Sequence, residues 1–239
     1  MMADTNPPTS TDLKAGLIEA LRASRDAERD VFGAVAPADR ETPAPDGGWS
    51  AKDVQSHLSA WKRTQIGRLE ATREGGDEPE IQLETDEINA IYQAERADRT
   101  WDEVVADADA TTDDLIAVIE RASDETIAID RVSGSIMGNG SEHALTHLPP
   151  IAASVGATAR VFELAGAIEG ILASYEWPER PITYAQYNLA CFYSLAGELD
   201  RARVLLRQCL PLREELRTFA AEDTDLTPLR DEITALSAG

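Results

Sequence analysis

The chain has 239 residues, of which 44 are acidic and 22 basic, and its formal net charge at pH 7 is -22. Hydrophobic residues make up 43% of the sequence, which is typical of a folded domain and too much for a disordered polyelectrolyte. A protein this acidic would repel a phosphate backbone, so we expect no binding to nucleic acid. No apolar run reaches the ~18 residues that a transmembrane helix needs, so we expect no membrane association.

The N-terminus and the cysteines bear on the compartment. Residues 1–10 are polar and contain prolines, without the apolar core of a secretory signal. Cys191 and Cys209 are too few for a disulfide framework, and we expect them to pack as small apolar side chains where helices touch. We therefore expect a cytoplasmic protein.

The acidic residues are concentrated in one stretch. Residues 74–125 contain 18 Asp or Glu against three Arg, which gives this stretch a charge of about -15. Acidic faces are usually solvated, so we expect this stretch on the outer side of the protein.

The first half of the chain has helical periodicity. Apolar residues recur at three- and four-residue steps over residues 11–35, which predicts a first helix. Prolines and glycines at residues 43–48 interrupt it. Ser50 is suited to cap a second helix, and Asp53 can complete a capping box with it. The Gly-Gly pair and the proline in residues 75–79 predict the end of that helix.

A third helical region is predicted to start near Thr85 and to restart at Thr100, where a Thr-x-x-Glu pattern forms another capping box. Residues 123–140 mix apolar residues with Gly, Ser and Asn. For these we expect a long loop with a short extended piece.

A fourth helix is predicted over residues 141–174, with Ser141 as its cap. Pro149-Pro150 would remove two hydrogen-bond donors from it, which predicts a kink or distorted turns. Four long helices and almost no strand signal predict an all-α four-helix bundle over residues 1–174.

The sequence changes character in residues 175–239, where we expect a second, helical region. Residues 175–181 are proline-containing and linker-like, and residues 184–211 are similar to a tetratricopeptide repeat. The matching residues are Asn188, Leu189, Ala190, Tyr193, Gly197, Ala202 and Leu206. Residues 222–230 resemble the capping end of such an array. One repeat cannot bury both of its faces, so this region either caps other helices or offers a groove to a protein partner.

The chain contains only three histidines, and their spacing indicates a common site. His57 follows Val54 by three residues and precedes Trp61 by four, so it lies within the apolar stripe of the second helix. His143 and His147 are four residues apart, and their step continues through apolar positions of the fourth helix. We expect all three side chains to face one core.

Such an arrangement suits a divalent metal ion. Two imidazoles four residues apart on a helix can reach one ion, and a third from a facing helix completes one face of its coordination sphere. Three neutral ligands favour a bound hydroxide or an anion such as a thiolate in the open positions. The alternative is three unrelated histidines, each hydrogen-bonded within the helical core or at a helix end.

Three short segments carry a family resemblance. They are residues 49–61 (WSAKDVQSHLSAW), residues 86–90 (DEINA) with Arg96 and Thr100 after them, and residues 143–151 (HALTHLPPI). In order and spacing they resemble the second, third and fourth helices of the DinB/YfiT-like superfamily. The middle segment is similar to the ClbS/DfsB and mycothiol-dependent maleylpyruvate isomerase branches.

The resemblance covers about residues 13–174 and implies an antiparallel four-helix bundle. It implies a metal ion, often zinc or nickel, bound by His57, His143 and His147, and frequently a homodimer. It also implies chemistry on small electrophilic substrates, with a low-molecular-weight thiol as co-substrate in some members. The double proline after His147 is nearer to the ClbS-like branch, in which metal need not be present.

The candidates for catalytic residues are Asp53, Asn89 and Tyr92. Asp53 could orient a group or accept a proton, although it also suits a helix cap. Asn89 and Tyr92 could line the site from the third helix, or be solvated.

Three functions stay open on the sequence. The first is a metal-dependent hydrolase or a thiol-dependent transferase or isomerase that acts on small electrophiles. The second is a non-catalytic scaffold that binds a partner through the repeat-like tail. The third is a metal-free, ClbS-like protective hydrolase.

Overall fold

The computed structural model describes residues 12–44, 48–73 and 84–237. Contacts between its elements divide the chain into two compact units, Met1–Glu176 and Trp177–Gly239. Every regular element of the described residues is helical, so the predicted all-α fold is confirmed. None of the described helices is both long and apolar enough to span a bilayer.

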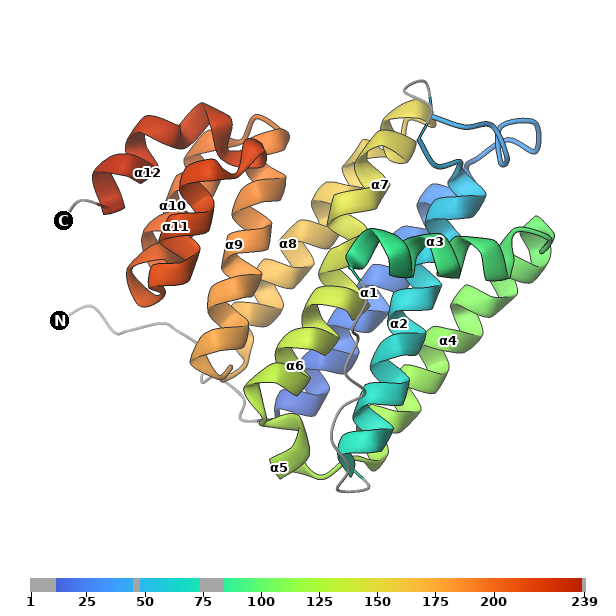
Figure 1. Ribbon diagram of the computed structural model, residues 1–239, viewed down its shortest axis with the longest axis horizontal. Helices are drawn as coiled ribbons and strands as arrows, with labels where there is room; N and C mark the ends of the chain where they lie inside the picture. Colours follow the sequence, from blue (N-terminus) through green and yellow to red (C-terminus); the bar gives the residue numbers. More distant parts are fainter. Residues whose placement is uncertain (1–11, 45–47, 74–83, 238–239) are drawn as a thin grey trace, which may run out of the picture. The chain divides into compact units, whose positions relative to one another are not determined.

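The first unit has a core of apolar side chains from several long helices. Its described elements are α1 (Leu13–Gly33), α2 (Ala51–Arg73), α3 (Thr85–Arg96), α4 (Trp101–Arg121), α5 (Asp124–Ile127), α6 (Asp130–Met137), the π-helical turn η1 (Gly138–Glu142), α7 (His143–Ser154) and α8 (Thr158–Ser174). The core lies between α1, α2, α4 and the continuous run from α6 through η1 to α7, and α8 packs on α1 and α7 (Figure 1). The largest side chains buried there include Leu17, Leu21, Phe32, Leu58, Leu69, Leu115, Ile119, Ile136 and Met137.

Local capping signals fix the starts of two helices as predicted. At the start of α2, the Ser50 hydroxyl donates to Asp53 Oδ2 (2.6 Å), and the backbone N–H of Asp53 donates to Ser50 Oγ (3.3 Å). At the start of α4, Thr100 and Glu103 form the predicted capping box. The predicted end of the second helix at residues 75–79 lies outside the described residues, and so do residues 45–47 of the break at 43–48 and the polar stretch 1–10.

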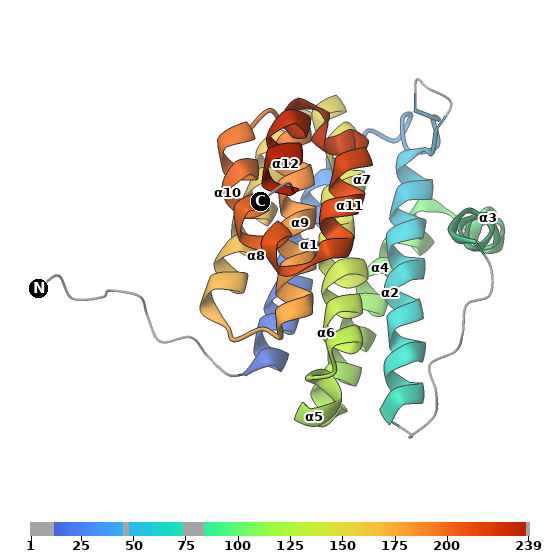
Figure 2. The same cartoon turned by 60° about the vertical axis from the view of Figure 1, so that its left-hand side comes forward.

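The helix α3 runs across α2 and not along it, and it packs mainly on that helix (Figures 1 and 2). Trp61 Nε1–H donates to Asn89 Oδ1 (3.0 Å), and the Tyr92 hydroxyl bonds Thr64 Oγ1 (2.6 Å). Beyond the end of α3, the ammonium of Lys52 donates to the carbonyl of Arg99 (3.1 Å). These polar contacts fix α3 beside the middle of α2.

The acidic stretch behaves as expected over its described part. None of the acidic side chains between residues 84 and 125 is buried. Several of those on α4 form ion pairs with arginines on α1 and α2, the closest being Arg63–Asp107 (2.6 Å), Arg25–Asp113 (2.7 Å) and Arg29–Asp109 (2.8 Å). These ion pairs therefore connect the outer surface of α4 to α1 and α2.

The loop predicted over residues 123–140 is wrong, because this segment is helical. Ser123 caps α5 by accepting the N–H of Thr126 (3.1 Å), and the apolar residues of α6 are buried at helical spacing. Gly134 lies within α6, Gly138 and Gly140 belong to the turn η1, and none of the three breaks the helical run. A Cβ on Gly140 would lie 2.8 Å from Leu21 Cδ2, so a close approach to α1 requires glycine there.

The single fourth helix predicted over residues 141–174 is also wrong, because it is two helices. Gly156 has φ +72° and separates α7 from α8, a backbone conformation that ends helices. Ser141 is not a cap but lies buried within η1. Pro149 and Pro150 lie inside α7, which continues past them to Ser154.

The second unit is a set of short helices. Its described elements are α9 (Glu179–Leu195), α10 (Leu199–Cys209), the 3-10 turn η2 (Leu210–Leu212), α11 (Glu214–Glu222), the 3-10 turn η3 (Thr224–Leu229) and α12 (Arg230–Ser237). The helices α9 and α10 form a hairpin whose turn contains Gly197 at φ +81° (Figure 2). Ala190, Tyr193 and Ala202 are fully buried, as a tight helix contact requires.

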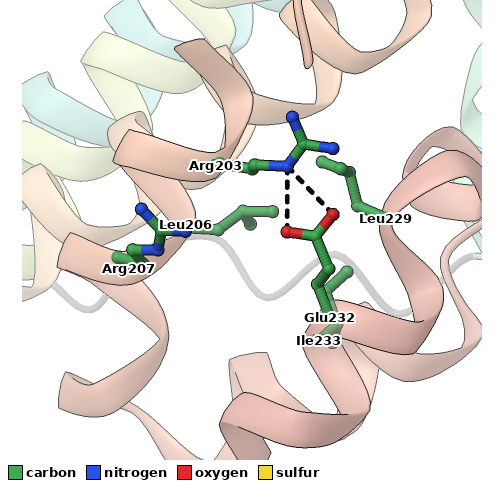
Figure 3. Close-up of a pocket in the computed structure, with 6 residues that line it drawn as sticks. All are labelled: Arg203, Leu206, Arg207, Leu229, Glu232 and Ile233. Atoms are coloured by element: carbon green, nitrogen blue, oxygen red, sulfur yellow. Dashed lines mark hydrogen bonds and ion pairs between the residues drawn. The ribbon is translucent and has the colours of Figure 1, made fainter. Parts of the chain in front are cut away.

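The helices α10 and α12 are joined by an ion pair between Arg203 and Glu232. Arg203 Nε donates to both carboxylate oxygens of Glu232 at 2.9 Å, above the buried side chains of Leu206, Leu229 and Ile233 (Figure 3). The unit thus has an apolar interior with polar contacts at its surface, and its likeness to a tetratricopeptide repeat stays a prediction.

Candidate metal centre

The three histidines of the chain converge in the first unit. Nε2 of His143 lies 3.1 Å from Nε2 of His57 and 3.0 Å from Nε2 of His147. One ring nitrogen from each residue falls within a group whose members are all within 4.8 Å of one another. The spacing argument from the sequence therefore placed the three side chains correctly.

The helices explain this convergence. His57 lies on the buried face of α2 and is only 5% exposed, while His143 and His147 occupy successive turns of α7 and are half-buried. The π-helical turn η1 directly precedes His143. A π-turn shifts the register of a helix by one residue and so re-aims the side chains after it, and such turns are frequent at functional sites.

Burial shifts the protonation of all three rings in the same direction. It lowers the pKa of His57 to about 3, with a smaller effect from His147. It lowers the pKa of His143 well below its usual value, and the neighbouring imidazoles and the Lys62 ammonium add to this effect. Burial also lowers the pKa of His147. At neutral pH the cluster therefore presents neutral imidazoles, which is the form that binds metals.

The contacts of these rings fit a divalent ion. Three Nε2 atoms that face one another cannot all be satisfied by a shared proton, whereas one cation would accept all three lone pairs. Metal-binding histidines usually donate their other N–H to a protein acceptor. Nδ1 of His57 and Nδ1 of His143 are buried and have no such partner in the described residues. Packing, and not a hydrogen bond at Nδ1, therefore orients these two rings.

Aromatic rings supply that packing. The ring of Trp49 lies 4.5 Å from that of His57 and 6.0 Å from that of His147, and it is nearly parallel to the latter, with 27° between the planes. The ring of Trp61 meets His57 and His143 edge-on, at 6.4 and 6.2 Å. Sequence reasoning placed Trp61 in the same apolar stripe as His57 but named Trp49 only as part of a motif. The position of Trp49, eight residues before His57, was the signal that could have placed it here.

The three weaker candidates have hydrogen-bond partners outside the cluster. Asp53 is engaged with Ser50 at the helix cap, Asn89 with Trp61, and Tyr92 with Thr64. None of them hydrogen-bonds a histidine in the part of the chain that the structure describes. Asn89 reaches the cluster only through Trp61, and the ring of Tyr92 packs 5.9 Å from that of Trp61. Their assignment to catalysis stays a prediction.

A buried ion pair that lies beside the cluster was not predicted from the sequence. Lys62 Nζ lies 2.6 Å from Glu28 Oε1, and the two side chains are 2% and 3% exposed. The hydroxyl of Ser24 donates to the same carboxylate oxygen (2.8 Å). Ser24 and Glu28 occupy inward positions in the stripe of α1, which is the signal that could have revealed a polar group in the core.

Comparisons with known proteins agree with the resemblance. The sequence model of the DinB superfamily matches residues 20–148, which is more than half of the chain and includes all three histidines. No match was found among curated proteins or among solved structures. The chain belongs to the DinB superfamily.

Proposed function

We propose that this protein is a metal-dependent enzyme that binds one divalent ion through His57, His143 and His147. The observation that carries the proposal is the convergence of three Nε2 atoms, with contacts of 3.0 and 3.1 Å, whose only described hydrogen-bonding neighbours are one another. A set of imidazole ligands suits zinc or nickel.

A divalent ion held there would supply Lewis acidity and lower the pKa of a bound water or thiol. The contribution of the chain is to hold three neutral ligands on two helices and to leave the other coordination positions open. For the reaction we propose attack on a small electrophile, either by water or by a low-molecular-weight thiol. Membership of the DinB superfamily supports this proposal.

The metal site can be tested ring by ring, because the chain has no histidine outside the cluster. A tag-free sample labelled with 15N-histidine gives one set of ring signals for each proposed ligand. Zn²⁺ added in steps should shift all three Nε2 signals together and saturate at one ion per chain. Each ring should then carry its proton on Nδ1. Shifts confined to one or two rings, or no saturation, would contradict a three-histidine site.

The reaction is tested with a panel of electrophiles under four conditions, with and without metal and with and without an added thiol. Turnover that needs metal supports the proposal, and dependence on the thiol separates transfer or isomerisation from hydrolysis. Turnover that survives metal removal would favour the metal-free hydrolase.

A second candidate is a scaffold that binds a protein partner through the second unit. Leu195, Val204 and Phe219 support it, because these large apolar side chains are 68%, 52% and 60% exposed. A metal-loaded protein that turns over no member of the panel would favour this candidate.

A further inference from the structure

The accessible edge of the histidine cluster is aromatic. Trp49 lies just before the cap of α2 and is half-buried, as are His143 and His147. Its ring lies 6.0 Å from that of His147 and is nearly parallel to it. A ligand held at the proposed metal position would lie near the indole of Trp49, because that ring is 4.5 Å from the ring of His57 and 6.0 Å from that of His147.

The polar atoms of the neighbouring rings are already used. Trp61 donates its N–H to Asn89, and the hydroxyl of Tyr92 donates to Thr64, because the Thr64 hydroxyl itself donates to the carbonyl of Ala60. Trp49 differs, since its indole N–H has no hydrogen-bond partner among the described residues. Trp61 and Tyr92 are thus fixed, and Trp49 keeps both a ring face and a donor for a ligand.

The charges around the cluster favour an anion. No carboxylate of the described residues hydrogen-bonds a histidine of the cluster, and the charge of Lys62 is compensated by Glu28. Three neutral imidazoles leave the charge of a bound divalent ion uncompensated. The group that completes its coordination should therefore be negatively charged.

We propose that this site selects a small monocarboxylate with a flat aromatic body, the carboxylate toward the ion and the ring against Trp49. This inference rests on the proposed metal site and adds the class of ligand. A flat ring gains by stacking on the indole, which a saturated ring of similar size cannot do. Trp49 is accordingly a specificity residue that contacts the ligand and takes no part in proton transfer.

The test uses the full chain loaded with Co²⁺, whose visible spectrum reports both metal binding and the arrival of an anion. Acetate, cyclohexanecarboxylate and benzoate are titrated as probes that differ in size and flatness. We expect benzoate to bind about fivefold more tightly than cyclohexanecarboxylate and at least about tenfold more tightly than acetate. Equal affinity for the two six-membered rings would overturn the proposal.

Two variants test whether the ring of Trp49 causes the preference for benzoate over cyclohexanecarboxylate. Trp49→Leu should reduce the ratio between benzoate and cyclohexanecarboxylate to about one, whereas Trp49→Phe, which keeps a flat face, should retain most of it. Trp101→Leu is the matched control, because Trp101 contacts Phe32 and Arg40 and has no ring contact with the cluster. It should leave the ratio unchanged. A ratio that persists in Trp49→Leu, or is lost in the control, would overturn the proposal.

The same titration separates the two proposals. If Co²⁺ does not bind at one ion per chain, the metal site fails and the ligand class fails with it. If Co²⁺ binds but the three carboxylates do not differ, the metal site stands and only the ligand class is overturned. Should Trp49→Leu not fold, the wild-type ratio and the Trp49→Phe variant still decide the question.

Discussion

Within the part of the chain that the structure describes, two groups of side chains bring three metal-ligating atoms within 4.8 Å of one another. One is the cluster of His57, His143 and His147 in the first unit, and the other consists of Cys191, Asp223 and Asp225 in the second. By distance alone the two are equivalent. The two groups differ in the hydrogen bonds that their side chains form.

In the second group the ligating atoms of Cys191 and Asp223 already take part in hydrogen bonds. Asp223 Oδ2 accepts from the hydroxyl of Tyr187 (2.6 Å) and lies 3.6 Å from the thiol of Cys191, and its Oδ1 accepts the N–H of Asp225 (3.0 Å). Burial raises the pKa of the Cys191 thiol, and the nearby carboxylates add to this effect, so the thiol stays protonated and binds metal poorly. The Nε2 atoms of the histidines face only one another. Whether lone pairs are already satisfied therefore distinguishes a candidate metal site from a structural network.

The largest expected effect comes from the ion pair beside the histidines. Glu28→Ala leaves the Lys62 ammonium buried without a partner, which should lower the free energy of unfolding by about 3–5 kcal/mol. The uncompensated positive charge should also weaken metal binding to the histidines. Urea denaturation and metal titration measure the two effects. The double variant Glu28→Leu/Lys62→Met is the control and should be close to wild type in stability.

Loss of one imidazole tests the contrast between the two groups directly. His143→Ala should weaken divalent metal binding by more than about 100-fold, since even the loss of a residue behind a ligand costs 10- to 100-fold. Asp223→Asn, at the centre of the other group, should leave metal binding unchanged. Calorimetry with Zn²⁺ and metal analysis after dialysis give the two values. Equal losses of metal affinity in the two variants would contradict this difference between the two groups.

The network in the second unit should matter for stability and not for metal. Tyr187→Phe removes the hydroxyl that donates to Asp223, and because that carboxylate is only half-buried we expect a loss of about 1–2 kcal/mol. Faster amide hydrogen exchange in α9 and α11 would locate the effect. A change in the stoichiometry of metal binding would show that this group is more than a structural network.

The sequence allowed correct prediction of features that depend on local spacing. The capping pairs at Ser50 and Thr100 and the convergence of the histidines follow from contacts three or four residues apart, or from one apolar stripe facing another. The segment 123–140 was mispredicted because its glycines indicate a loop by themselves. Gly140 is required instead by a close approach to Leu21, which lies more than 100 positions away in the chain.

Other features depend on how helices pair and could not be inferred from one helix at a time. From the sequence of α2 alone, Lys62 would be predicted to be solvated, but α1 places Glu28 opposite it. The break at Gly156 was missed because Pro149-Pro150 gave the stronger breaking signal, yet α7 contains both prolines. Proline has no N–H to donate at any helical position, yet α7 continues past both prolines to Ser154.

The smallest effect tests the protonation of the histidines without metal. Because burial lowers the pKa of His57 in the folded protein to about 3 and its unfolded value is near 6.5, the unfolded chain binds more protons between these values. The stabilising contribution is therefore complete above about pH 6.5 and falls as the pH decreases. His57 alone should account for a loss of about 1 kcal/mol in the free energy of unfolding between pH 6.5 and 5.5.

Urea denaturation in the presence of a chelator should show this dependence on pH in the wild type and a shallower one in His57→Gln. Tyr187→Phe, measured at the same two pH values, is the control and should keep the wild-type slope. A slope unaffected by His57→Gln would mean that the imidazole has the same pKa in the folded and the unfolded protein, which would contradict the lowering of its pKa by burial.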